Sequence, residues 1–283
     1  MQQSDVTLPD GRVLHLYDES PHRPGPRDIP VFWHHGTPQS GQLPAPLLRA
    51  ARRHGVRLLS HERPGYGMST SLPGRDVADV AADVAALADH LRIGRFAVLG
   101  ASGGGPHALA CAAVLGDRVA AVASMASIAP FDADGLDWFA GMDPSGVAEF
   151  DAASRGRADL AAHLTREVDV DFSEFAPADL STFAGPYGEW LVESSAEGLA
   201  GGLDGALDDD LAFVAPWGFD LADIATPVCI VHGGADRFVP ESHARWLAGR
   251  CPDAELRVTP DDGHVSVFEH TEQTFTWLVQ HRR

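Results

Sequence analysis

One pentapeptide constrains the fold of this chain more than any other feature, the sequence G-A-S-G-G at positions 100–104. It stands between a short apolar run at 96–99, typical of a buried strand, and an alanine-rich segment at 108–115, typical of a helix. A serine between glycines at such a junction indicates a sharp strand-to-helix turn that exposes the hydroxyl of Ser102 above the sheet edge. In a chain with 29 glycines the pattern alone is weak, so its surroundings must support it.

Short apolar runs alternate with segments of helical spacing along most of the chain. Strands are expected at 6–8, 13–17, 29–34, 56–60, 96–99, 119–124, 228–232 and 256–258. Helices are expected at 43–54, 76–91, 108–115, 241–249 and 265–280. Alternation at this spacing predicts an α/β fold, with a mostly parallel sheet of eight strands and helices on both faces.

The alternation breaks between residues 131 and 215, after the sixth expected strand. The pattern there is mostly helical, with Asp143 and Pro144 as a helix start, so we expect a helical cap on a core of 1–130 and 216–283. This segment holds nineteen acidic residues against three arginines, a net charge of −16. A solvated acidic surface is the simplest explanation, but the field of such a segment also favours a neutral or cationic substrate over an anionic one.

The charged composition excludes several classes of function. All 21 basic residues are arginine, so lysine Schiff-base chemistry and lysine general bases are excluded. The net charge of −19 argues against nucleic acid or an anionic membrane as a partner. No apolar run is long enough to span a bilayer and the first residues lack a signal-peptide pattern, so we expect a cytoplasmic protein. Without a C-x-x-C pair, Cys111 and Cys229 are expected to be buried free thiols.

Two further segments supply the partners that a serine nucleophile requires. The sequence G-G-A-D at 233–236 follows the expected strand 228–232, and His264 follows the last expected strand. The carboxyl ends of parallel strands meet at one sheet edge, so we expect Asp236 and His264 to lie near Ser102. In this Ser, Asp, His order the histidine would take the serine proton, and Asp236 would orient the imidazole and stabilise its charged form.

Simpler explanations exist for each of these residues. Ser102 could be only a helix N-cap, and His264 only one loop histidine among the fourteen in the chain. Asp236 could be a turn residue, with the acid supplied instead after the strand at 119–124. The candidates for that acid are Asp132 and Asp134. His107, which falls within the helix after Ser102, is expected to serve packing rather than catalysis.

Five motifs in this order resemble the α/β-hydrolase superfamily over nearly the whole chain. They are H-G-T-P at 35–38, R-P-G-Y-G-M-S at 63–69, G-A-S-G-G at 100–104, G-G-A-D at 233–236 and G-H at 263–264. The resemblance implies an α/β-hydrolase sheet with a helical cap inserted after strand 6. It also implies an oxyanion hole, which the backbone N–H groups of Thr37 and Gly103 would form here. No cofactor and no metal ion are expected.

The residue at the nucleophile position separates branches of this superfamily. Epoxide hydrolases and haloalkane dehalogenases have an acid there, hydroxynitrile lyases rely on a lysine, and proline iminopeptidases usually have tryptophan where this chain has Gly103. We therefore expect a serine hydrolase that cleaves a small, mostly apolar carboxylic ester, lactone or thioester through an acyl-enzyme on Ser102. The remaining alternatives are an aminopeptidase or amidase, a carbon–carbon bond hydrolase and, from another class, a ligand-binding or non-hydrolytic protein with this fold.

Overall fold

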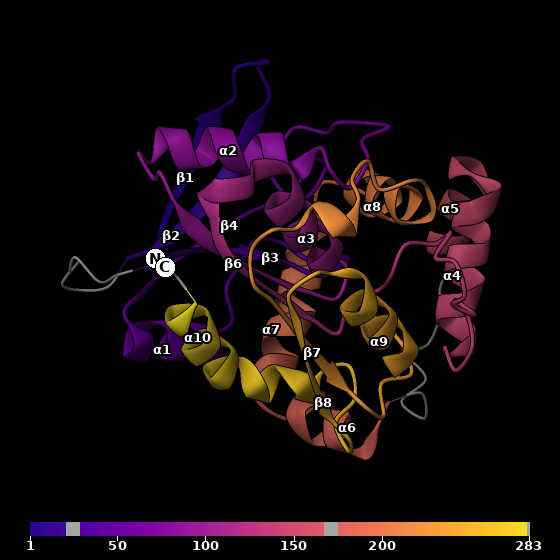
Figure 1. The fold of residues 1–283 in the computed structure, drawn as a ribbon. Helices are drawn as coiled ribbons and strands as arrows, with labels where there is room; N and C mark the ends of the chain where they lie inside the picture. The colour runs from indigo at the N-terminus through magenta and orange to yellow at the C-terminus, as the bar shows by residue number, and fades with distance from the viewer. Residues whose placement is uncertain (21–28, 167–174, 282–283) are drawn as a thin grey trace.

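The computed structural model describes residues 1–20, 29–166 and 175–281. An eight-stranded sheet runs through its centre, with the strand order β1-β2-β4-β3-β5-β6-β7-β8 (Figure 1). The strands are β1 Gln2–Thr7, β2 Val13–Glu19, β3 Ile29–His34, β4 Val56–His61, β5 Phe96–Ala101, β6 Val119–Met125, β7 Val228–Gly233 and β8 Ala254–Thr259. β2 pairs antiparallel with β1 and β4, and the other neighbouring pairs are parallel. The predicted eight-stranded, mostly parallel sheet is confirmed.

Helices cover both faces of the sheet, as the alternating pattern predicts. On one face lie α1 (Ala45–His54) and α10 (Thr271–Gln280), and on the other α2 (Val80–His90), α3 (Gly104–Leu115) and α9 (Glu241–Arg250). Successive side chains along a strand point to opposite faces, so the central strands contribute to two apolar cores. In β3, Val31 and Trp33 belong to the core under α1, whereas Phe32 belongs to the core under α2.

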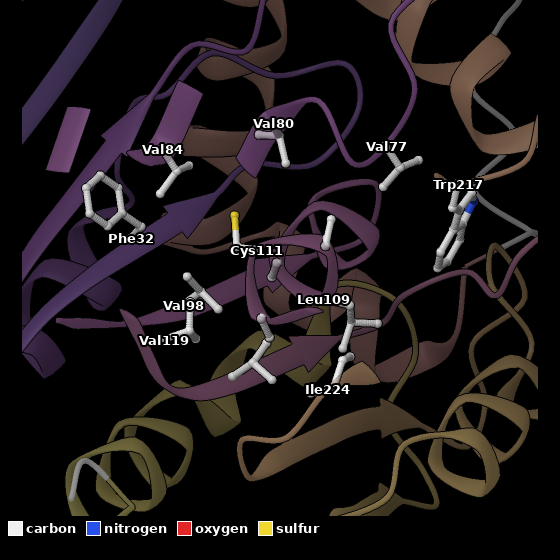
Figure 2. Close-up of a cluster of buried hydrophobic side chains, with 14 of the residues drawn as sticks. Phe32, Val77, Val80, Val84, Val98, Leu109, Cys111, Val119, Trp217 and Ile224 are labelled. Carbon is white, nitrogen blue, oxygen red and sulfur yellow. The ribbon is translucent and has the colours of Figure 1, made fainter. Parts of the chain in front are cut away.

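Figure 2 shows part of the core under α2 and α3. Apolar residues of β3, β5 and β6 meet residues of the two helices there; those labelled are Phe32, Val98, Val119, Val80, Val84, Leu109 and Cys111. All three cysteines of the chain are buried and free. The prediction of buried free thiols at Cys111 and Cys229 is confirmed.

The helix predicted over 76–91 begins later than its apolar pattern indicates. Asp76 accepts a hydrogen bond from the N–H of Asp79 (3.0 Å), and Asp79 accepts one from the N–H of Asp76 (2.9 Å). Reciprocal bonds of this kind form a capping box, which satisfies N–H groups that have no partner within the helix. The regular helix α2 follows this turn and starts at Val80.

The helix predicted over 265–280 is divided into two parts. The first part is a short 3₁₀ segment, Ser266–His270, and α10 follows it. At the beginning of the first part, the carboxylate of Asp179 accepts hydrogen bonds from the N–H groups of Val265 (2.9 Å) and Ser266 (2.7 Å). A residue distant in sequence thus fixes this turn, which periodicity alone could not predict.

The segment between β6 and β7 is mostly helical in the residues that the structure describes. Its helices are α4 Pro144–Arg155, α5 Arg157–Leu164, α6 Pro177–Phe183, α7 Pro186–Gly198 and α8 Asp204–Val214. α4 begins as predicted, because Asp143 accepts a hydrogen bond from the N–H of Gly146 (2.9 Å). In Figure 1, α4 and α5 lie at one margin of the molecule beside α8, with which they share an apolar cluster.

The other helices of this segment join the body of the molecule. Tyr187 and Trp190 of α7 belong to the core under α1, and Phe213 of α8 belongs to the core under α2. The division into a core of 1–130 and 216–283 and a cap of 131–215 stays a prediction. Across the described ranges, no helix has both the length and the apolar composition that crossing a membrane requires.

Candidate active site

Ser102 lies at the turn between β5 and α3, as predicted. Its backbone is in the left-handed region, with φ of +51°, which a non-glycine residue rarely adopts. The turn is tight: a Cβ on Gly100 would lie 2.2 Å from the carbonyl oxygen of Gly104, and a Cβ on Gly104 would lie 2.1 Å from that of His34. Glycine is therefore required at both positions, and the turn holds the Ser102 side chain at the carboxyl edge of the sheet.

Ser102, His264 and Asp236 form one continuous hydrogen-bonded row. Ser102 Oγ lies 3.0 Å from Nε2 of His264, and Nδ1 of His264 lies 2.8 Å from Oδ2 of Asp236. The second Asp236 oxygen accepts hydrogen bonds from the N–H groups of Phe238 (2.9 Å) and Val239 (2.8 Å). These bonds fix the carboxylate, which in turn fixes the orientation of the imidazole.

The protonation of His264 is set by two opposing effects. Burial lowers the pKa of His264, but the neighbouring Asp236 carboxylate raises it, and the result is a pKa above the usual value. Asp143 acts in the same direction as Asp236. An imidazole in such a setting can accept a proton from a serine hydroxyl and hold it beside a carboxylate.

The alternative acids lie elsewhere. Asp132 is exposed, and the backbone oxygen of Asp134 accepts hydrogen bonds from Trp246 (2.9 Å) and Arg250 (3.3 Å). Neither residue lines the pocket described below. The structure therefore brings Asp236, and neither of the alternatives, to His264.

The loop that carries His264 is held by an aspartate of α6 that sequence reasoning did not identify. Asp179 is 1% exposed, and its Oδ2 accepts a hydrogen bond from the N–H of His264 (3.1 Å). A Cβ on Gly263 would lie 2.1 Å from the same oxygen. The G-H pair at 263–264 thus combines two requirements: glycine makes room for the aspartate, and histidine reaches Ser102.

A second unpredicted aspartate, Asp209 of α8, lies at the centre of a buried ionic network and is 0% exposed. Its carboxylate pairs with Arg63 (2.5 Å) and Arg75 (2.7 Å) and accepts hydrogen bonds from the hydroxyls of Tyr66 (2.8 Å) and Thr37 (2.7 Å). Burial would raise the pKa of Asp209, but the two guanidinium groups hold it well below its usual value. The network ties helix α8 directly to the loop that contains Thr37.

Arg63 binds that loop as well. Its guanidinium donates to the carbonyl oxygens of His35 (2.5 Å) and Gly36 (3.1 Å), and its backbone N–H donates to Nε2 of His35 (3.2 Å). His107 also joins the network, with Nε2 3.2 Å from a carboxylate oxygen of Asp209. Burial lowers the pKa of both His35 and His107, so both rings are neutral and have structural hydrogen bonds.

Thr37 and Gly103 lie side by side in the pocket lining. A Cβ on Gly103 would lie 2.4 Å from Oγ1 of Thr37 and 3.1 Å from a ring carbon of Phe213, so a large residue after Ser102 would not fit. No described residue accepts a hydrogen bond from the backbone N–H of Thr37 or of Gly103. Both N–H groups can therefore donate to an oxygen of a bound molecule.

Ser102 and His264 open into a pocket of about 590 Å³. Much of its lining is aromatic and comes both from the sheet edge and from the helices that follow β6. The phenylalanines of the lining are Phe150, Phe175, Phe183, Phe213, Phe238 and Phe268. A pocket of this size and character suits a small, mostly apolar molecule.

Three carboxyl groups also line the pocket, and we call Asp143, Glu149 and Asp210 the acidic wall. Asp210 is 2% exposed, and its carboxyl has no hydrogen bond or ion pair with any residue that the structure describes. Asp143 is 1% exposed, and its Oδ2 is buried without a partner. The described lining contains no arginine, so these carboxyls face a space without a fixed cation other than a protonated His264.

The environment of the wall raises the pKa of two of its carboxyls, Asp210 and Glu149. Burial, together with the charges of Glu149 and Asp209, raises the pKa of Asp210 well above its usual value. Burial and the charge of Asp143 raise the pKa of Glu149 to about 7. Among the described residues no group of three or more His, Cys, Asp or Glu side chains is arranged to hold a metal ion.

The simplest explanation of the acidic segment, a solvated surface, is wrong for part of it. Five of its aspartates are no more than 2% exposed: Asp143, Asp179, Asp208, Asp209 and Asp210. The sequence does contain one signal for this. Three consecutive helical residues at 208–210 span about 200° around the helix axis, so they cannot all face solvent when the helix has a packed side.

Comparisons with known proteins agree with the fold. The profile of a family described as alpha/beta hydrolase fold matches residues 29–271. A non-heme chloroperoxidase of Streptomyces lividans is 30% identical over 84% of both chains, and a bifunctional esterase/perhydrolase of Acinetobacter calcoaceticus is 29% identical over 83% of both. The enol-lactonase of Burkholderia xenovorans has the same fold, with a TM-score of 0.71 over 98% of each chain at 21% identity. The chain belongs to the α/β-hydrolase family and is an enzyme of the hydrolase class.

Proposed function

We propose that this enzyme is a serine hydrolase that cleaves small, mostly apolar carboxylic esters, lactones or thioesters through an acyl-enzyme on Ser102. The observation that carries this proposal is the hydrogen-bonded row from Ser102 through His264 to Asp236, which opens into an aromatic pocket. The esterase/perhydrolase among the relatives supports an ester as substrate.

The proposed mechanism assigns one role to each group. His264 takes the proton of Ser102 as its Oγ attacks the acyl carbon, and then returns this proton to the leaving alcohol or thiol. Asp236 holds the imidazole and stabilises its charged form. The N–H groups of Thr37 and Gly103 stabilise the oxyanion of the tetrahedral intermediate, where the loss of one donor typically costs about 10²–10³ in rate. Water then attacks the acyl-enzyme with His264 as the base.

The charge around the pocket narrows the proposed substrate further. The acidic wall and the net charge of −16 over residues 131–215 repel an anionic substrate. We therefore propose a neutral or cationic small molecule as the substrate. The cytoplasmic location stays a prediction of the sequence.

Labelling with a fluorophosphonate, which reacts with activated serines, tests the nucleophile. The wild-type protein is expected to be labelled and the Ser102→Ala variant to remain unlabelled. A screen of p-nitrophenyl esters, lactones and aminoacyl arylamides then separates esterase from peptidase activity. A folded wild-type protein without labelling or turnover would overturn the proposal and favour a non-hydrolytic or ligand-binding role.

The relatives favour perhydrolysis as a second candidate activity of the same site. In this reaction hydrogen peroxide attacks the acyl-enzyme in place of water. The acyl group is transferred to the peroxide and released as a peroxyacid, and Ser102 regains its proton. Two of the relatives, a non-heme chloroperoxidase and an esterase/perhydrolase, are the reason to test it. Peroxyacid formation from an ester and hydrogen peroxide, lost in Ser102→Ala, would support it.

A further inference from the structure

No bond-making or proton-transfer step of the proposed hydrolysis of a neutral ester passes through the acidic wall, although the charge of Asp143 raises the pKa of His264. The row from Ser102 to Asp236 is complete without it, and the apolar lining is enough to bind an acyl chain. Carboxyl groups in an apolar pocket lose hydration, and a buried polar group without a partner destabilises the fold by a few kcal/mol. The Oδ2 atom of Asp143 is in this position, and the carboxyl of Asp210, which is 2% exposed, lies against the pocket beside Glu149.

Elsewhere in this chain, buried aspartates have partners. Asp209 pairs with two arginines, and Asp179 accepts backbone N–H groups. Asp208 pairs with Arg157 through Oδ1, and its Oδ2 is buried without a partner but lies outside the pocket lining. Only in the pocket, among the described residues, do buried aspartate oxygens face a space that a ligand would occupy. A ligand is therefore the partner that the arrangement lacks.

The ligand group that fits is an organic cation. A cation bound among these carboxyls stabilises their charged form and so offsets the burial that raises the pKa of Asp210 and Glu149. The described residues offer no cluster of ligands for a metal ion. A primary ammonium has three N–H donors, which matches several carboxyl oxygens converging from α8 and from the beginning and body of α4.

We propose that the acidic wall formed by Asp143, Glu149 and Asp210 is a subsite for a primary ammonium group of the substrate, so that the preferred substrates are esters bearing an amine. This inference rests on the proposed serine hydrolysis at Ser102 and names its substrate class. The ammonium could belong to the acyl chain or to the leaving alcohol. Both cases share one chemistry, and the experiment below distinguishes them.

Matched ester pairs test the subsite directly. In the first arm, esters of 6-aminohexanoate are compared with the same esters of heptanoate, where a methyl group replaces the ammonium. In the second arm, the 6-aminohexyl ester of an apolar acid is compared with its heptyl ester, and both chains are then shortened stepwise. One arm is expected to favour the ammonium substrate by about 10-fold in kcat/KM, the size of one charge-assisted hydrogen bond.

Variants of the wall show whether the preference arises there. Asp210→Asn and Glu149→Gln keep the shape of the side chains and remove the charge, so the ratio of the two kcat/KM values is expected to fall toward one. The ratio comes from one protein sample, and a loss of folded enzyme therefore cancels. Asp208→Asn is the matched control, because Asp208 lies on the same helix but pairs with Arg157 outside the pocket lining; its ratio is expected to stay unchanged.

A binding measurement separates failure of the subsite from failure of the proposed function. Calorimetry on Ser102→Ala is expected to show hexylammonium binding at least about 10-fold tighter than 1-hexanol, with the difference lost in the double variant with Asp210→Asn. Equal binding of the two probes, or a preference that survives both wall substitutions, would overturn the subsite even if neutral esters are hydrolysed. Preferential hexylammonium binding without any ester turnover would keep the subsite and reject the hydrolysis.

Discussion

Two adjacent residues of helix α8 show how differently one fold can treat a buried carboxyl. Asp209 faces the sheet edge, where two guanidiniums, two hydroxyls and a histidine surround it. Asp210 faces the pocket, where no described residue pairs with it. Burial acts on both groups, but the pKa of Asp209 lies well below its usual value and that of Asp210 well above. The carboxylate of Asp209 is fully paired within the fold, whereas the carboxyl of Asp210 is available to a molecule in the pocket.

The largest effect is expected from Asp209→Asn, which removes the charge that pairs with Arg63 and Arg75. Removing one partner of a buried ion pair leaves the other charges uncompensated and typically costs about 3–5 kcal/mol. Thr37 and the loop held by Arg63 would also lose their anchor, so kcat is expected to fall by about 10²-fold with KM nearly unchanged. Denaturant unfolding and steady-state kinetics on a neutral ester measure the two effects.

Thr37→Val is the matched control for this prediction. It removes the hydroxyl that donates to Asp209 and keeps the backbone N–H of Thr37 and the ion pairs of Arg63 and Arg75. Its kcat is expected to fall with a loss of stability of only about 1 kcal/mol. An Asp209→Asn enzyme with wild-type kcat would show that the network has no part in placing the Thr37 loop.

The comparison also explains which parts of the site could be predicted from the sequence. Ser102, Asp236 and His264 each follow directly after a short apolar run, and parallel strands bring such positions to one edge. Asp179 and Asp209 gave no such signal, because their partners lie far away in the chain: Asp179 binds the loop of His264, and Asp209 binds Thr37 and Arg63. A count of charges could not distinguish a solvated carboxylate from one that a distant arginine neutralises.

The central strands were predicted more accurately than the ends of two helices, because local patterns determine the former and single side-chain hydrogen bonds the latter. The central strands were predicted well because burial on both faces leaves continuous apolar runs, as in β5 and β6. The first strand, predicted at 6–8, spans Gln2–Thr7, because most of its side chains are exposed and leave no apolar run. The start of α2 and the division before α10 depend on single aspartate side chains that bind backbone N–H groups. Apolar periodicity does not record such hydrogen bonds, so the predicted boundaries at 76–91 and 265–280 were wrong.

A smaller effect is expected from Glu149→Gln on the pH dependence of stability. A carboxyl whose pKa is raised on folding stabilises the protein fully below its unfolded pKa of about 4, and this contribution is lost as the pH rises through the folded value. For Glu149 the folded pKa is about 7. Asp209 has the opposite sign: its contribution is present above about pH 4 and is lost on acidification.

Glu149→Gln should therefore remove the loss of stability at high pH and leave the loss on acidification, which comes from Asp209, unchanged. Between about pH 5 and pH 8 the wild-type protein is expected to lose about 2–3 kcal/mol more stability than the variant. Urea unfolding at several pH values measures this difference. Below about pH 4 both proteins are expected to lose stability in parallel, because the network of Asp209 is intact in each. Identical curves at high pH would show that Glu149 is not strained in the folded state.

The smallest effect is expected from Asp143→Asn, because Asp143 has one carboxyl oxygen with a hydrogen bond and one without. Its Oδ1 accepts a hydrogen bond from Gly146 at the start of α4, whereas its Oδ2 is buried without a partner. Asp143→Asn keeps the helix cap, since asparagine caps helices as well as aspartate does, and removes a charge that raises the pKa of His264.

The pH profile of ester hydrolysis reports the pKa of His264 and therefore the effect of the Asp143 charge on it. Because His264 must be neutral to take the serine proton, kcat/KM on a neutral ester is expected to rise with pH, with a midpoint above about 6.5. In Asp143→Asn the midpoint is expected to move down by about 0.3 pH unit, since one of the charges that favour the imidazolium is lost. An unmoved midpoint would mean that the charge of Asp143 does not act on His264.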